Sequence, residues 1–113
     1  MVRKPEPVIR ENMRGGRGRV YIYDVISKEE FLGHGRMYAK MVIPPGGSIG
    51  VHVHDNETEP YYILEGTGIF IDENGDRIPV GPGDSCTILP GQSHGIENAG
   101  DTDLVFMALI YNA

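Results

Sequence analysis

The residues best suited to chemistry lie between positions 46 and 66, in the stretch GGSIGVHVHDNETEPYYILEG. His52 and His54 are two positions apart, so both imidazoles leave the same face of an extended strand. Glu59 follows at the start of a second run with strand character. Imidazole suits zinc, copper, iron and nickel, and a carboxylate extends the range towards manganese. The stretch is therefore a candidate site for a divalent transition metal, although a solvated or core pair of histidines has the same spacing.

Short strands are the elements that must position these side chains. Residues 20–26 are rich in β-branched and aromatic side chains, and residues 36–43 alternate between apolar and polar positions. Asn74-Gly75 predicts a tight hairpin turn between two further strands. No stretch has the periodicity of an amphipathic helix of three turns. About nine or ten short strands favour an all-β fold, an antiparallel sandwich or barrel of the jelly-roll type.

Alternation along the strands predicts which residues surround the two histidines. If His52 and His54 point inward, Ser48 and Gly50 do so too, and their small size leaves room for a ligand. The other inward positions are apolar except for Tyr61, and each fits plain core as well as a ligand contact. These candidate lining residues are Met41, Ile43, Tyr61, Ile63, Cys86, Ile88 and Phe106.

Length and composition favour one domain without covalent cross-links. A chain of 113 residues forms a single core, here expected over residues 20–113 behind an irregular arm at residues 1–19. The one cysteine excludes an intramolecular disulfide and a cysteine-rich zinc site. The amino terminus has no apolar stretch of the signal-peptide type, and the longest apolar run, residues 104–111, is too short to span a bilayer. We therefore expect a cytoplasmic protein without membrane contacts.

Charge is unevenly distributed along the chain. Residues 1–40 carry nine Lys or Arg against five Asp or Glu, whereas residues 41–113 carry one against eleven. A basic arm on an acidic body can fold over its own domain or over a partner subunit. The arm contains one arginine-glycine segment, MRGGRGR, without repeats or interleaved aromatic residues, so we expect no binding to nucleic acid.

Two motifs with fixed spacing indicate a family. They read Gly46-x5-His52-x-His54-x4-Glu59-x6-Gly66 and Gly83-x5-Leu89-x-Gly91-x2-His94-x3-Asn98. Both resemble the conserved motifs of the cupin family, and the second departs from the family pattern only at Leu89, where cupins usually have proline. Pro90 follows directly.

The resemblance implies a double-stranded β-helix, the cupin barrel, and one divalent metal per chain, namely manganese, iron or zinc. The implied metal ligands are His52, His54, Glu59 and His94. Glu57 is a competing carboxylate, but its two-residue offset places it in the turn. The short segment at residues 67–82 and the stretch ENMRGGRG look like those of small microbial cupins, some of which are grouped with oxalate decarboxylases. Cupins of this size are homodimers as a rule, which makes a homodimer the expectation here.

Two function classes follow from such a site. Three imidazoles and one carboxylate leave a six-coordinate ion two open positions, which suit a small anionic ligand bound through two oxygens. One hypothesis is a metal-dependent lyase or dioxygenase that acts on a small carboxylate or carbonyl compound, as an oxalate decarboxylase does. Its general acid or base, other than the ligands, is not identifiable from the sequence. The alternative is a module that binds a metal and a small molecule without turnover.

Overall fold

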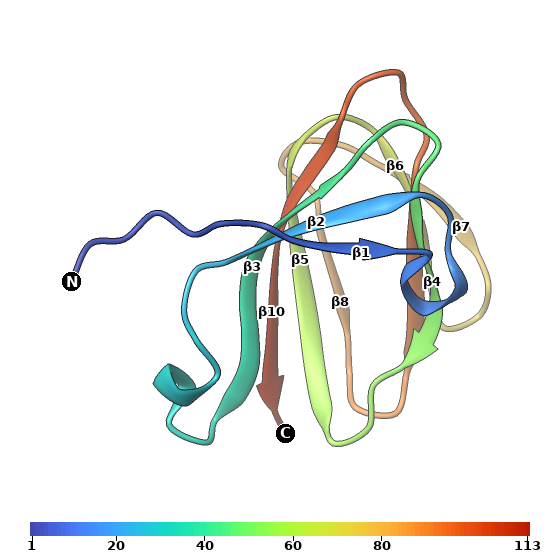
Figure 1. The fold of residues 1–113 in the computed structure, drawn as a ribbon. Helices are drawn as coiled ribbons and strands as arrows, with labels where there is room; N and C mark the ends of the chain where they lie inside the picture. Colours follow the sequence, from blue (N-terminus) through green and yellow to red (C-terminus); the bar gives the residue numbers. More distant parts are fainter.

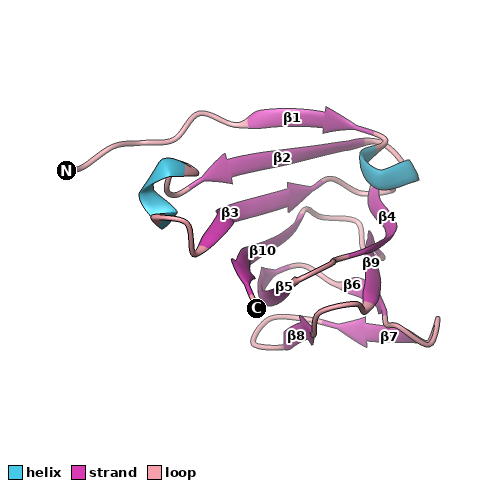
Figure 2. Cartoon of the chain, turned by 90° about the horizontal axis from the view of Figure 1, so that it is seen from below, coloured by secondary structure: helices cyan, strands magenta, loops and turns pink.

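Two antiparallel β-sheets enclose the core of the molecule, as Figures 1 and 2 show. The computed structural model describes residues 1–113. The larger sheet has the strand order β1-β2-β3-β10-β5-β8, and the smaller has the order β4-β9-β6-β7. The strands are β1 (Val8–Glu11), β2 (Arg19–Asp24), β3 (Gly35–Ile43), β4 (Ser48–Val53), β5 (Glu57–Glu65), β6 (Gly68–Ile71), β7 (Arg77–Val80), β8 (Ser85–Ile88), β9 (Ser93–Asn98) and β10 (Leu104–Asn112). Two short 3-10 helices complete the chain, η1 (Met13–Gly15) and η2 (Glu29–Phe31). The expected all-β jelly-roll architecture is confirmed.

Alternating residues of the two sheets form the core. Ala39, Met41 and Ile43 of β3 are buried, as their period of two predicted. The long apolar run near the carboxyl end forms β10, which lies between β3 and β5 in the larger sheet. Its inner residues join the same core, whereas Met107 and Leu109 are half-buried on the outer face. Neither helical turn has the length and apolar character needed to cross a membrane.

The amino-terminal segment is more regular than expected. Val8–Glu11 forms β1, which pairs with β2 so that Val8 faces Ile22 and Glu11 faces Arg19. All side chains of β1 are exposed, so no alternation marks it as a strand in the sequence. It forms because the edge of β2 offers backbone donors and acceptors, which a neighbouring strand satisfies whatever its side chains.

The strand that carries His52 also departs from the simple alternation. Its pairing with β9 shifts register between Ile49 and His52, which is the signature of a β-bulge. As a result Ile49, rather than Ser48, lines the same cavity as His52. The space beside Gly50 is filled by backbone, because a Cβ atom there would lie 2.1 Å from the carbonyl oxygen of Arg14. η1 thus packs against the small residues of β4, and these residues do not leave room for a ligand.

The hairpin predicted at Asn74-Gly75 connects β6 and β7, but its turn is longer than two residues. Ile71 pairs with Arg77, so residues 72–76 form the loop, and only Gly75 within it has a positive φ. The carboxylate of Asp72 accepts hydrogen bonds from the backbone N–H groups of Asn74 and Asp76. This Asx-type bonding stabilises the wider turn.

Candidate metal centre

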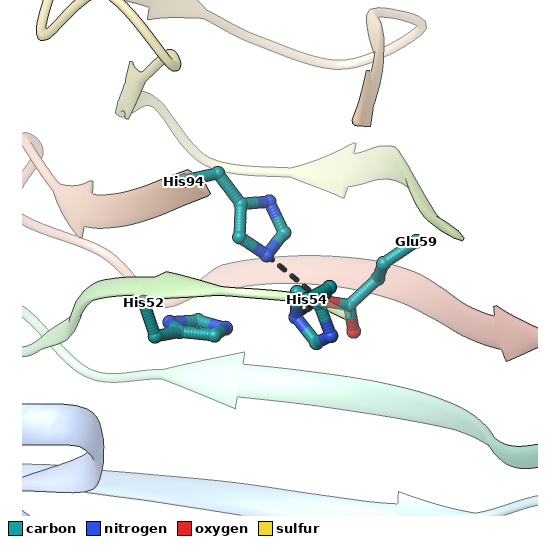
Figure 3. Close-up of side chains that lie close together, drawn as sticks. All are labelled: His52, His54, Glu59 and His94. Atoms are coloured by element: carbon teal, nitrogen blue, oxygen red, sulfur yellow. Dashed lines mark ion pairs between the residues drawn. The ribbon is translucent and has the colours of Figure 1, made fainter. Parts of the chain in front are cut away.

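Three histidines and one glutamate from both sheets converge on one point (Figure 3). His52 lies in β4 directly opposite His94 of β9, and His54 follows the last residue of β4. Glu59 comes from β5 of the larger sheet. One donor atom from each of the four residues lies within 4.8 Å of the others. The structure therefore brings together all four of the ligands that the sequence motifs indicated.

The donor atoms are buried and short of hydrogen-bond partners. His94, His54 and Glu59 are 0%, 2% and 3% exposed, and His52 is half-buried. Oε1 of Glu59 lies 3.0 Å from Nε2 of His54 and 2.9 Å from Nε2 of His94. Both Nε2 atoms and Nδ1 of His94 are nonetheless without a hydrogen-bond partner. Buried polar atoms are rarely left unpaired, and a cation would satisfy the two Nε2 atoms that face Glu59.

Outer contacts orient two of the imidazole rings. Nδ1 of His52 lies 2.7 Å from the carbonyl oxygen of Gly50, and Nδ1 of His54 lies 2.7 Å from Oε1 of Glu57. When each Nδ1 carries the proton and donates it, each Nε2 keeps its lone pair for a metal. Arg36 in turn donates two hydrogen bonds to the carboxylate of Glu57. Sequence reasoning placed Glu57 in the turn, but it is the first residue of β5 and holds His54.

The charge states of His52 and Glu59 suit a cation. Burial lowers the pKa of His52 to about 4, which keeps this imidazole neutral. Burial raises the pKa of Glu59, but the contacts with His54 and His94 outweigh it and leave the pKa below its ordinary value. The Arg36 guanidinium lowers the pKa of Glu57 to about 2. Neutral imidazole and ionised carboxylate are the forms that bind a metal.

Comparison with known proteins now agrees with the two motifs. The sequence pattern of the cupin domain matches residues 39–110, a range that includes all four donors. The chain belongs to the cupin family. An oxalate-binding protein of Thermotoga maritima is 50% identical over 99 residues, which are 88% of this chain and 81% of that protein. A crystal structure described as a predicted oxalate decarboxylase of Thermotoga maritima has a TM-score of 0.94 at 45% identity and covers 100% of this chain and 99% of that one.

More distant cupins share the fold alone. A polyketide cyclase of Streptomyces resistomycificus has a TM-score of 0.78 at 20% identity, with 98% of this chain and 78% of that chain covered. At this identity the chemistry does not transfer, because one fold supports many reactions. The function of this cupin must therefore be argued from its own site.

A small cavity lies beside the donors of this cupin. Its volume is about 40 Å³, and it is lined by Met13, Arg14, Arg36, Met37, Met41, Ile49, His52, His54, Glu59, Tyr61 and Ile110. Met41 and Tyr61 were among the lining residues expected from the sequence. Cys86 and Ile88 line a separate hollow beside β6 and β7, and Ile43, Ile63 and Phe106 are fully buried in the core.

The sequence analysis missed several residues of this wall. Met37 shares the inward parity of Met41, so alternation alone could have added it. Ile110 likewise shares the inner face of its strand with Phe106. Met13 and Arg14 had no such signal, because only the folded position of η1 brings them to the cavity. Alternation places Arg36 on the outward face of β3. It is the second residue of that strand, and it nevertheless lines the cavity.

Proposed function

We propose that this cupin binds one divalent transition metal through His52, His54, Glu59 and His94, and that the metal holds a small dicarboxylate of the oxalate class. The four donors lie within 4.8 Å of one another, and three ring nitrogens of the histidines are buried without hydrogen-bond partners. This observation supports the metal part of the proposal. Three imidazoles and one carboxylate suit manganese, iron or zinc. The bound ion would supply a positive centre with open positions for oxygen ligands.

The size and charge of the cavity support a small anion as the ligand. A cavity must have at least about 10–15 Å³ to hold one water molecule. The cavity of about 40 Å³ therefore accepts only a few atoms beside the metal. Arg14 and Arg36 belong to its lining. Guanidinium groups favour carboxylates because their donors match the two oxygens. The similarity to an oxalate-binding protein agrees with a two-carbon dicarboxylate.

The lining favours binding over turnover. Glu59 is the one carboxylate in the wall, and the proposed metal ligation would occupy it. The neighbouring Glu57 is held by Arg36, with a pKa lowered to about 2. Burial raises the pKa of Tyr61 well above its ordinary value. A lyase needs a group that accepts and donates a proton near neutral pH. Neither Glu57 nor Tyr61 has a pKa close enough to neutral for this role.

Metal analysis and calorimetry test the proposal. Protein purified without chelator or nickel resin should contain one transition metal per chain, and His94→Ala should lose most of it. Sodium oxalate should bind to the manganese-loaded protein and raise its melting temperature. A metal content near zero after reconstitution would overturn the site. Formation of formate or carbon dioxide above the His94→Ala background would instead support the enzyme hypothesis.

We further propose that two chains associate through the outer face of the larger sheet. Tyr38, Tyr62, Met107 and Leu109 surround an apolar hollow on this face, and Tyr62 is 50% exposed. Burying such a face against its symmetric copy removes apolar surface from water. Light scattering should report twice the mass of one chain, and Tyr62→Lys should shift it towards the monomer. A monomeric wild-type protein would contradict this assembly.

A further inference from the structure

The turn η1 lies against β4, as the dark blue segment after β1 in Figure 1 shows. Two of its residues, Met13 and Arg14, line the cavity beside the candidate metal centre. The backbone N–H of Ser48 donates to the carbonyl of Arg17 at 2.8 Å, and the N–H of Arg17 donates to Oγ of Ser48 at 2.9 Å. Glycine at positions 16 and 50 allows close approach, since a Cβ atom at either would meet backbone at 2.2 Å or 2.1 Å. Backbone contacts therefore fix η1 at the cavity, independently of its side chains.

Arg14 occupies an unusual backbone conformation within this turn. Its φ is 55°, in the left-handed region that bulky residues rarely adopt, and the next residue, Gly15, also has a positive φ. Glycine or asparagine would take this conformation at lower cost. A costly conformation kept by a long charged residue points to a role for its side chain.

The charge of Arg14 is uncompensated, in contrast to that of its neighbour in the cavity wall. Arg36 forms a two-pronged pair with Glu57, at 2.9 Å and 2.8 Å. Arg3, Arg19 and Arg77 also pair with glutamates, whereas Arg14, like the exposed Arg10 and Arg17, forms no ion pair. Of the two arginines that line the cavity, Arg14 is therefore the one that is not already paired with a carboxylate.

Arg14 also lines a larger hollow that adjoins the cavity. An outer hollow of about 430 Å³ shares Met13, Arg14, Arg36 and Met37 with the small cavity beside His52. Arg14 and His52 both line the small cavity, so this arginine belongs to the same wall as one of the proposed metal ligands.

The net charge of the metal, its ligands and a bound dicarboxylate suggests how a positive side chain at Arg14 would act. A divalent ion with Glu59 as its single anionic ligand and three neutral imidazoles keeps one net positive charge. A dicarboxylate dianion reverses that charge, which is unfavourable in a mostly buried site. On the basis of the metal and dicarboxylate function proposed above, we propose that Arg14 binds the ligand's carboxylate oxygens and makes the site selective for dianions over monoanions.

Calorimetry of manganese-loaded variants with oxalate and glycolate tests this role. Both ligands have two carbons and can offer two oxygens to a metal, but glycolate has one carboxylate. Arg14→Asn removes the charge while asparagine tolerates the left-handed conformation. It should weaken oxalate binding roughly 10- to 100-fold, the range of a lost charge-assisted hydrogen bond, and change glycolate binding much less. Arg14→Lys, which keeps the charge, should recover part of the oxalate affinity.

Arg17→Asn is the matched control, because Arg17 is an exposed arginine of the same segment that does not line the cavity. It should bind oxalate as the wild type does. Manganese content and melting temperature of each variant show that the metal centre and fold are intact. Unchanged oxalate affinity in a metal-loaded Arg14→Asn protein would overturn the role of Arg14 alone. A wild-type protein that binds manganese but neither ligand would overturn the dicarboxylate function as well.

Discussion

Nδ1 of His54 lies 2.7 Å from Oε1 of Glu57, a residue that the sequence had placed in the turn before the strand. The carboxylate is itself fixed by two hydrogen bonds from Arg36. This chain of contacts sets both the tautomer and the orientation of the His54 ring. Glu57 therefore orients His54 and is not itself one of the four candidate donors.

Glu57→Gln is expected to weaken metal binding about 10- to 100-fold, because loss of a partner that orients a ligand has effects of that size. Titration against a competing chelator measures the affinity. Glu97→Gln is the control, since Glu97 forms a similar two-pronged pair with Arg77 outside the cavity wall. Equal metal affinity in Glu57→Gln and wild type would show that the contact has no orienting role.

The metal-free protein should lose stability as the pH falls from about 6.5 to about 4, owing to His52. Its pKa is lower in the folded state than in the unfolded state, so the unfolded chain binds more protons in this window. His54 has a raised pKa, and its contribution is present at low pH and is lost as the pH rises. Urea unfolding of wild type and His52→Asn in the presence of chelator separates the two effects. As the pH falls, the free energy of unfolding of the wild type should decrease relative to that of His52→Asn. A constant difference between the two proteins would refute the lowered pKa of His52.

Gly50→Ala should displace η1 from β4. The added Cβ would lie 2.1 Å from the carbonyl oxygen of Arg14. Neither atom can rotate away, because one is attached directly to the backbone and the other is part of it, so one of the two segments must move. We expect a loss of about 1–3 kcal/mol in the free energy of unfolding. Gly81→Ala should change stability by no more than about 0.5 kcal/mol, since its nearest contact would be at 3.9 Å. Similar urea midpoints for the two variants would contradict the close packing of η1.

Cys86 should react slowly with alkylating reagents at neutral pH. Burial, followed by the charge of Asp84, raises the pKa of its thiol to about 11, so very little reactive thiolate forms. Mass spectrometry after timed exposure to iodoacetamide should show far slower labelling of the folded protein than of the chain in urea. Labelling at similar rates would mean that the residue is accessible and ionised.

Local patterns were enough to predict most of the strands, and the resemblance of two motifs to the cupin family indicated the four candidate metal donors. The alternation in β3 reflects the period of two of any strand with one buried face, so Met41 and Ile43 could be placed inward from the sequence. His52 and His54 share a face for the same reason. His94 is forty residues beyond His54, and its place at the site rested on the second motif, which the strand pairing between β4 and β9 now explains.

The sequence by itself indicated the all-β class through residue type and alternation, which are local properties of the chain, and the four candidate donors through two motifs that resemble those of cupins. Only the tertiary structure decided that residues 8–11 form a strand, since backbone pairing with β2 leaves no trace in their side chains. It also decided that a bulge turns Ile49 inward and that η1 docks at Gly50. The pairing of Arg36 with Glu57 and the role proposed for Arg14 likewise depend on contacts between residues far apart in the chain, which no local pattern encodes.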